Sequence, residues 1–250
     1  MSTFELTPIV VGRFPAFPLN RFLLGGPEVT IEAPCLAWLA RDEVGRSILV
    51  DTGPLAPTAE TMDVHVGLEV GAEHRIDHAL ELAGFDPADV DTVVFTHLHF
   101  DHCAYGEFLP NARFLVQADE LRYAVLPDRP PQRIAYEVGY EHILPSWFTV
   151  FDRLSTVDGF HEVAPGCRIV PLPGHSPGSA GVIFDTARGR VAAVGDLVNQ
   201  MENWRSADGS HIPPALHTSL DDCLASFALL EAEADIVLAS HDYRMLEDWS

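Results

Sequence analysis

The sequence is poor in cysteine and contains neither a long apolar run nor a leader-like N-terminus. Its four cysteines are widely separated and form no Cys-x-x-Cys pair, which argues against a disulfide framework and against a thiolate zinc site. No stretch approaches the roughly 18 consecutive apolar residues that a membrane-spanning helix needs. The first residues show no basic segment followed by an apolar one, so no secretory signal is visible and a cytoplasmic location is expected.

Basic side chains are also scarce: 15 Lys and Arg stand against 37 Asp and Glu, a formal net charge of -22. A phosphate backbone or an anionic membrane is bound by clustered basic side chains, and no cluster is present. The charge therefore argues against nucleic-acid and membrane partners and indicates a solvated acidic surface. The length of 250 residues and the hydrophobic fraction of 47% are typical of one globular domain over residues 1–250.

Runs of apolar residues predict many strands with a few helices between them. Strands are expected at 29–39, 47–50, 92–95, 113–116, 168–172, 181–184, 191–194 and 236–238. One helix is expected over 73–82, ended by Gly84, and another over 220–232. The apolar face of the second helix is predicted to consist of Leu224, Phe227, Ala228 and Leu230. This order of elements indicates a layered α/β or α+β domain.

Residues 127–160 stand apart because prolines and aromatic side chains are interspersed there. Such a segment does not extend a sheet easily. Two interpretations stay open: a helical excursion that packs its aromatic rings on the core, or a cap that lines an apolar substrate pocket. Phe14, Phe17, Phe22 and Leu23 pose a similar choice, between a loop over the active site and a contact in a homodimer.

Residues 97–102 read His-Leu-His-Phe-Asp-His and are the most informative stretch. Three imidazoles and a carboxylate within six positions are four potential metal ligands. The preceding run Val93-Val94-Phe95 predicts a buried strand, so the cluster lies where a strand ends and a loop begins. A rigid scaffold can hold ligands there while solvent still enters, and the pattern indicates a metalloenzyme.

Three further candidates each follow an apolar strand, namely His175, Asp196 and His241. Any one of them alone is weak evidence, since a lone histidine is more often structural. The ends of several strands at one edge of a sheet converge, however, and a shared site is then the better interpretation. Imidazole and carboxylate ligands without thiolate favour zinc, with iron, manganese and cobalt as alternatives.

Together with Asp51-Thr52-Gly53, these residues resemble the metallo-β-lactamase superfamily. The motifs occur in the family's order and span nearly the whole chain. The resemblance implies an α+β fold, a four-layer αβ/βα sandwich with two facing sheets and helices outside. It also implies a site for two divalent metal ions at one edge.

The resemblance assigns seven ligands and one supporting residue. The first metal would be held by His97, His99 and His175. The second would be held by Asp101, His102 and His241. Asp196 would bridge the two metals, and Asp51 would orient ligand histidines from outside. Between two such ions a metal-bound hydroxide can form at neutral pH and attack a carbonyl, so hydrolysis is the expected reaction.

Within the superfamily the chain looks most like the N-acyl homoserine lactonases, which implies a lactone or carboxylic ester as the small-molecule substrate, with an apolar portion. One departure concerns substrate binding, because those enzymes commonly carry a tyrosine three residues after the bridging aspartate, where this chain has Asn199. Asn199 would donate to a developing oxyanion or serve as an ordinary loop residue. Tyr105 and Tyr243 are the other candidates for that role, beside Asp101 and Asp196 as catalytic carboxylates.

Two other functions stay open. A glyoxalase-II-like thioesterase would share all seven ligands but would need basic residues for the carboxylates of glutathione. A metal-binding scaffold would keep the ligands without turnover. The physiological substrate, the native metal and the oligomeric state are not determined by the sequence.

Overall fold

The computed structural model describes residues 3–59, 61, 65, 67–141 and 143–249. Two sheets face each other, with strand orders β1-β2-β3-β4-β5-β6 and β11-β10-β9-β8-β7. The strands are β1 (Phe4–Pro18), β2 (Thr30–Asp42), β3 (Ser47–Val50), β4 (Thr92–Val94), β5 (Arg113–Gln117), β6 (Leu154–Val157), β7 (His161–Ala164), β8 (Cys167–Pro171), β9 (Ala180–Thr186), β10 (Gly189–Ala193) and β11 (Ile236–Leu238). The α-helices are α1 (Ile76–Leu82), α2 (Ala118–Val125), α3 (Pro130–Ala135), α4 (Met201–Trp204), α5 (Leu220–Glu233) and α6 (Arg244–Asp248).

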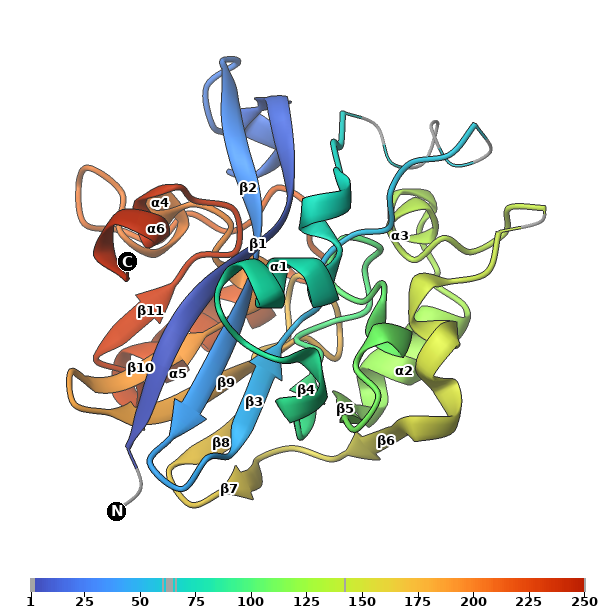
Figure 1. Ribbon diagram of the computed structural model, residues 1–250. Helices are drawn as coiled ribbons and strands as arrows, with labels where there is room; N and C mark the ends of the chain where they lie inside the picture. The colour runs from blue at the N-terminus through green and yellow to red at the C-terminus, as the bar shows by residue number, and fades with distance from the viewer. Residues whose placement is uncertain (1–2, 60, 62–64, 66, 142, 250) are drawn as a thin grey trace.

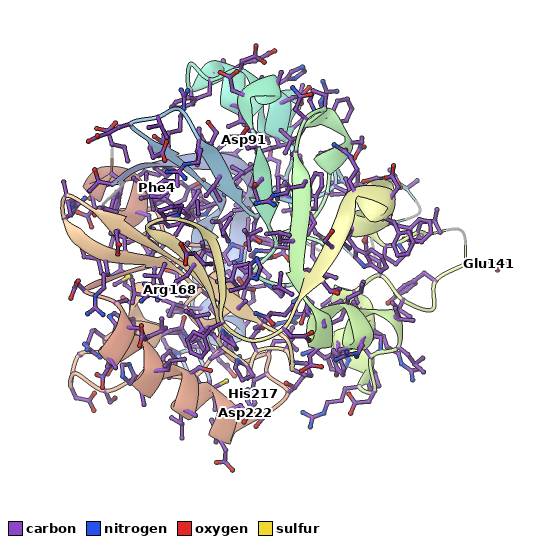
Figure 2. All side chains as sticks on the ribbon, turned by 90° about the horizontal axis from the view of Figure 1, so that it is seen from below. Phe4, Asp91, Glu141, Arg168, His217 and Asp222 are labelled. Atoms are coloured by element: carbon purple, nitrogen blue, oxygen red, sulfur yellow. The ribbon has the colours of Figure 1, made fainter. Side chains whose placement is uncertain are left out.

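Helices cover the outer faces of both sheets. Helix α1 lies on the first sheet, and α5 packs on the second (Figure 1). Seen from below, the helix that carries Asp222 lies beyond the second sheet, on the side away from the first (Figure 2). The predicted αβ/βα sandwich is therefore confirmed.

The alternation of side chains along β2 explains these layers. Leu36, Trp38 and Ala40 point into the core between the two sheets. Their neighbours Ala37 and Leu39 belong to the second core cluster, beneath α1. Because successive side chains of a strand point to opposite faces, one fully buried strand contributes to both apolar layers.

The strand directions bring several chain ends to one edge. Strands β3, β4, β5 and β6 pair in parallel. In the second sheet β10 is parallel to β11, while β9 is antiparallel to both β8 and β10, so β8, β10 and β11 run in one direction. The loops that follow these strands are where the candidate ligands lie.

The N-terminal segment is a strand rather than a loop. Residues Phe4–Pro18 pair antiparallel with β2, with register shifts between Val10 and Gly12 and between Phe14 and Phe17. Proline removes a backbone donor and interrupts apolar alternation, which hid this strand in the sequence. It is tolerated because β1 is at the edge of its sheet.

The segment 127–160 is built from helices and one strand. It contains α3, a 3₁₀ helix at Ser146–Arg153 and the whole of β6, which pairs in parallel with β5 and extends the first sheet. Tyr136, Trp147 and Val150 are buried in the core beneath the first sheet. Phe148 and Phe151 stack on each other and remain about half exposed.

No helix among the described residues is long and apolar enough to cross a membrane.

The buried face of α5 differs from the predicted one. Cys223, Ser226, Phe227 and Leu230 are buried, whereas Leu224 and Ala228 are exposed. The observed spacing of three, four and seven residues from Cys223 is the ordinary period of one helix face. The prediction is confirmed for Phe227 and Leu230 and wrong for Leu224 and Ala228, because the helix carries apolar residues on more than one face.

We expect Phe227→Ala to lower the free energy of unfolding by about 3–5 kcal/mol, because it empties a fully buried site between α5 and the second sheet. Leu224→Ala on the same helix is the matched control and should change stability by less than about 0.5 kcal/mol. Urea unfolding followed by circular dichroism measures both. Equal losses for the two variants would contradict this packing of α5.

Candidate metal centre

Five loops bring the candidate ligands to one place. The hexapeptide follows β4, and His175 lies in the loop between β8 and β9. Asp196 lies in the 3₁₀ helix Gly195–Leu197 after β10, and His241 follows β11. Asp51 follows β3. Each apolar strand fixes its last residue firmly, so the polar side chains that follow converge without a contiguous motif.

The structure brings all seven predicted ligands together in two groups of four that share one residue. In each group the candidate ligand atoms lie within 4.8 Å of one another. The first group is His97, His99, His175 and Asp196. The second group is Asp101, His102, Asp196 and His241.

Asp196 lies between the two groups and turns one oxygen to each. Its Oδ2 is 4.0 Å from His97 Nε2 and 3.7 Å from His175 Nε2. Its Oδ1 is 3.1 Å from His102 Nε2 and 3.3 Å from His241 Nε2. The hydroxyl of Ser240 donates to the same Oδ1 at 2.8 Å and fixes the carboxylate plane. One carboxylate therefore presents an oxygen to each group.

Three imidazoles are anchored through Nδ1. His102 Nδ1 donates to Asp51 Oδ2 at 2.9 Å. His241 Nδ1 donates to the Pro34 carbonyl at 2.9 Å, and His175 Nδ1 donates to the Leu216 carbonyl at 2.7 Å. These acceptors have no proton to give, so the ring proton is on Nδ1 and the lone pair is on Nε2, directed to the centre.

The other two imidazoles are held by side chains. Thr96 Oγ1 donates to Asp51 Oδ2 at 2.8 Å and so accepts from His97 Nδ1 at 3.1 Å. His99 is the reverse case, because its Nε2 is 2.8 Å from Gln132 Oε1 and its Nδ1 faces inward. All five rings therefore have one nitrogen bound to the protein and one turned to the site.

The inward nitrogens fit metal ions. The Nε2 atoms of His97, His102 and His241 are buried and have no hydrogen-bond partner among the described residues. His99 Nδ1 and His175 Nε2 face each other at 3.0 Å although both carry lone pairs. Buried lone pairs that converge in this way need a cation between them. With nitrogen and carboxylate ligands only, the two groups fit two divalent metal ions.

The electrostatics of the two groups differ. Burial holds the pKa of His97 and of His99 well below the usual value. Burial alone would also lower the pKa of His102, yet the carboxylates of Asp196, Asp101 and Asp51 raise it well above the usual value. The pKa of His241 is raised, against its burial, chiefly by Asp196. The second group therefore holds positive charge more strongly than the first.

Asp51 supports the site from outside, as the resemblance implies for this position. Its Oδ1 accepts from the Thr96 amide at 2.8 Å, and its Oδ2 accepts from Thr96 Oγ1 and His102 Nδ1. The backbone of Asp51 is left-handed, with φ 61°. The carboxylate thereby contacts Thr96 and His102, which lie in the loop after the neighbouring strand β4.

A cavity of about 660 Å³ opens onto the two groups. Its floor includes His99, Asp101, His175 and Asp196, beside Asn199. Its wall is mostly apolar and is formed by Phe14, Phe17, Phe22, Phe100, Pro130, Pro131, Ile134, Ala135, Ala215 and Leu216. Arg21 is the one cationic side chain among the described residues of this wall.

The wall shows which aromatic segment faces the site. Of the described residues in 127–160, those that line the cavity all belong to α3, and they are proline and aliphatic side chains. The aromatic side chains come mostly from β1 and the residues after it. Phe22 stacks on the His241 ring with centroids 5.1 Å apart, and Phe14 meets the same ring at 5.8 Å.

The three candidates for a substrate-binding donor lie in different places. Asn199 lines the cavity, is buried, and donates through Nδ2 to the Asp196 carbonyl at 3.1 Å. The Tyr105 hydroxyl accepts from the Ala56 amide at 3.0 Å. The Tyr243 hydroxyl donates to Glu32 at 3.1 Å near the surface. Neither tyrosine is among the residues that line the cavity.

Sequence reasoning missed two supporting residues. Gln132 holds His99, as described above. Glu120 is fully buried and accepts from the Leu98 amide at 2.8 Å, from the Tyr136 hydroxyl at 2.6 Å and from Ser176 Oγ at 2.5 Å. It thereby ties the hexapeptide to the loop of His175. A buried glutamate cannot be told from an exposed one in a sequence, so no pattern in the sequence identifies Glu120.

Comparison with known proteins gives consistent similarities. The family model of the metallo-β-lactamase superfamily matches residues 31–241. An N-acyl homoserine lactonase from a Bacillus species is 28% identical over 189 residues, which cover 72% of this chain and 70% of that protein. The N-acyl homoserine lactonase AttM of Agrobacterium fabrum is 41% identical over 85 residues, which cover 34% of this chain and 32% of that protein.

Solved structures share the fold over almost the whole chain. A quorum-quenching N-acyl homoserine lactone lactonase superposes with a TM-score of 0.74 and 24% identity, covering 99% of this chain and 96% of its own. An N-acyl homoserine lactone hydrolase with N-hexanoyl-L-homoserine at its catalytic metal centre gives a TM-score of 0.75 and 22% identity, with 99% and 97% covered. At these identities the likeness is one of fold.

We expect Asp196→Asn to weaken metal binding by more than about tenfold, since even residues that only touch a ligand cost that much. The variant removes the charge shared by both groups, so both equivalents should be affected. Metal content after gel filtration, with Asp208→Asn in an exposed loop as control, measures the change. Retention of both ions by Asp196→Asn would contradict the bridging geometry.

Metal affinity should fall as the pH is lowered, because protons compete for the same nitrogens. The pKa values of His102 and His241 are raised, so their competition begins at a higher pH than for an ordinary histidine. His97 and His99 have lowered pKa values, so protons compete with the metal for their nitrogens only at a lower pH. Titration with a metal chelator at several pH values should show one equivalent lost before the other. Two equivalents lost together would argue against this difference.

Proposed function

The chain belongs to the metallo-β-lactamase superfamily, and on that premise we propose that it is a metal-dependent hydrolase of lactone or carboxylic ester bonds, with N-acyl homoserine lactones as its substrate class. The observation that carries the proposal is the cavity, where an apolar wall leads to Asp101, Asp196 and Asn199 beside the two ligand groups. A volume of about 660 Å³ accommodates a small molecule with an acyl chain.

The residues of the site fit two divalent ions, and zinc is the favoured metal. His97, His99 and His175 would hold one ion, Asp101, His102 and His241 the other, with Asp196 shared. When bound, the two ions would supply Lewis acidity for the carbonyl and a water of lowered pKa. Iron, manganese and cobalt accept the same ligands, and a comparison of activities after reconstitution distinguishes them.

The chain's own groups have separate tasks on the two sides of the scissile bond. The free N–H of Asn199 Nδ2 donates to the carbonyl oxygen as negative charge develops on it. Asp101, on the cavity floor, accepts the proton released when water adds to the carbonyl carbon. The same carboxyl returns the proton to the ring oxygen as the C–O bond breaks. The product of a lactone is then the ring-opened hydroxy acid.

The apolar wall binds the acyl part. Phe17, Ile134 and Leu216 face the cavity and bury aliphatic surface at about 25 cal/mol per Å². Each additional methylene in the wall is worth about 0.8 kcal/mol. Longer acyl chains should therefore lower KM until the wall is filled.

A glyoxalase-II-like thioesterase fits the site less well. Glutathione thioesters carry two carboxylates, and Arg21 is the one cation among the described residues that line the cavity. A scaffold that keeps metal without turnover is the remaining alternative. Assays on lactoylglutathione test the first alternative, and absence of any turnover by the metal-loaded protein would favour the second.

The metal-loaded protein should hydrolyse N-acyl homoserine lactones, and Asn199→Ala should lower kcat by about 10²-fold because it removes an oxyanion donor. Tyr105→Phe and Tyr243→Phe are matched controls that remove hydroxyl groups lying off the cavity, and their kcat should stay close to that of the wild type. Ring opening is followed by pH-stat. No turnover of acyl-homoserine lactones, simple lactones or aryl esters would refute the proposed function. A loss in Tyr105→Phe with none in Asn199→Ala would refute only the role of Asn199.

A further inference from the structure

Gln132 joins the wall of the cavity to a candidate metal ligand. It lies in α3 and is almost fully buried, although a glutamine side chain is usually exposed. Its Oε1 is 2.8 Å from His99 Nε2. Its Nε2 donates to the backbone carbonyl of His175 at 3.2 Å. One amide therefore contacts two residues of the same ligand group.

The hydrogen bonds of Gln132 fix which nitrogen of His99 carries the proton. The His175 carbonyl only accepts, so the amide NH₂ of Gln132 must face it and the amide oxygen must face His99. That oxygen has no proton to give, and His99 Nε2 is therefore the N–H donor. The lone pair of His99 is then on Nδ1, which faces the centre and lies 3.0 Å from His175 Nε2.

His99 differs from the other four rings in what anchors it. His97, His102 and His241 are anchored by the Asp51–Thr96 pair or the Pro34 carbonyl of β2. His175 is anchored by the backbone carbonyl of Leu216, which lies in the cavity wall. His99 alone is held through Nε2, and its anchor is a side chain of α3, the helix that forms another part of that wall. Pro130, Pro131, Ile134 and Ala135 of α3 line the cavity, while Gln132 is not among the lining residues and contacts His99.

Neighbouring contacts hold α3 against the hexapeptide. The Phe100 amide donates to the Ala135 carbonyl at 2.8 Å. The Tyr136 ring meets the His99 ring edge-on, with centroids 4.5 Å apart, and its hydroxyl donates to buried Glu120. Several contacts thus hold α3 against the hexapeptide, and among them the hydrogen bond of Gln132 is the one made to an imidazole nitrogen.

We propose that Gln132 is a positioning residue that sets the tautomer and ring orientation of His99, and so links the cavity wall to the first ligand group. Loss of its amide oxygen frees His99 to place its proton on Nδ1 and to rotate. The first group, His97, His99, His175 and Asp196, would weaken, while the second group would keep its ligands and their anchors. The proposal concerns metal binding and holds whichever ester the enzyme cleaves.

The chain offers a matched control in Gln117. It is also buried, and its amide likewise donates one hydrogen bond and accepts one, but both go to backbone: it donates to the Gly159 carbonyl at 2.7 Å and accepts from the Gly159 amide at 3.0 Å. None of its hydrogen bonds reaches a candidate ligand. Gln132→Met and Gln117→Met each remove two hydrogen bonds of a buried amide, so Gln117→Met controls for the general effect of that loss on folding.

The experiment is a competition for Zn²⁺ between a chromophoric chelator and the purified full-length protein, in the wild type, Gln132→Met, Gln132→Glu and Gln117→Met. In Gln132→Met the dissociation constant of one of the two equivalents should rise by about 10–100-fold. Gln117→Met should leave both equivalents unchanged. Gln132→Glu keeps an acceptor for His99 at the same reach but loses the donor to the His175 carbonyl, so it should recover part of the affinity.

Two further measurements separate positioning from folding. Gln132→Asn keeps the amide but shortens it, so it should fold like the wild type and lose the same equivalent; it replaces Gln132→Met if that variant does not fold. In the Co²⁺-loaded protein the visible absorption of one site should change in Gln132→Asn and stay constant in Gln117→Met. Equal metal affinities for the Gln132 variants and Gln117→Met would overturn the proposal. That result would leave the proposed hydrolase activity untouched, since turnover is measured separately.

Discussion

Five buried imidazoles share one constraint: each must give one nitrogen to the protein and keep the other for the centre. A free imidazole can place its proton on either nitrogen, and a ring that chose wrongly would present N–H where a lone pair is needed. The fold prevents this with acceptors that have no proton, among them Asp51 and the carbonyls of Pro34 and Leu216. The choice of tautomer thus depends on contacts up to 207 residues apart in the sequence.

The sandwich supplies those contacts because two sheets end at the same edge. The first sheet contributes Asp51 and the hexapeptide, and the second contributes His175, Asp196 and His241. The core between the sheets fixes the distance between the two sets of strand ends. Asp196 can then reach both groups with one carboxylate, one oxygen to each. Packing far from the site therefore sets the separation on which the bridging geometry depends.

Much of the site was predictable from the sequence, since strand ends that carry His or Asp are local patterns. The strands around positions 48, 93 and 237 are short apolar runs, and their bounds were predicted closely. Strand β1 was not, because Pro8, Gly12 and Pro15 break its alternation, and only pairing with β2 makes it a strand. Gln132 and Glu120 could not be recognised either. Their roles come from burial and from partners in other segments, which no local pattern encodes.

The position of Phe22 on the His241 ring has a consequence for how substrate preference can change over evolution. Most of the aromatic wall lies on the N-terminal segment, far along the chain from the ligand motifs, so it can vary without touching them. Phe17 can be replaced without disturbing a ligand, because it faces the cavity and packs against Phe14 and Phe22 rather than against a ligand ring. Phe22 cannot be replaced in this way, because its ring stacks on His241 and helps to hold it in place. New substrate specificities should therefore arise first at wall residues, such as Phe17, that do not contact a ligand histidine.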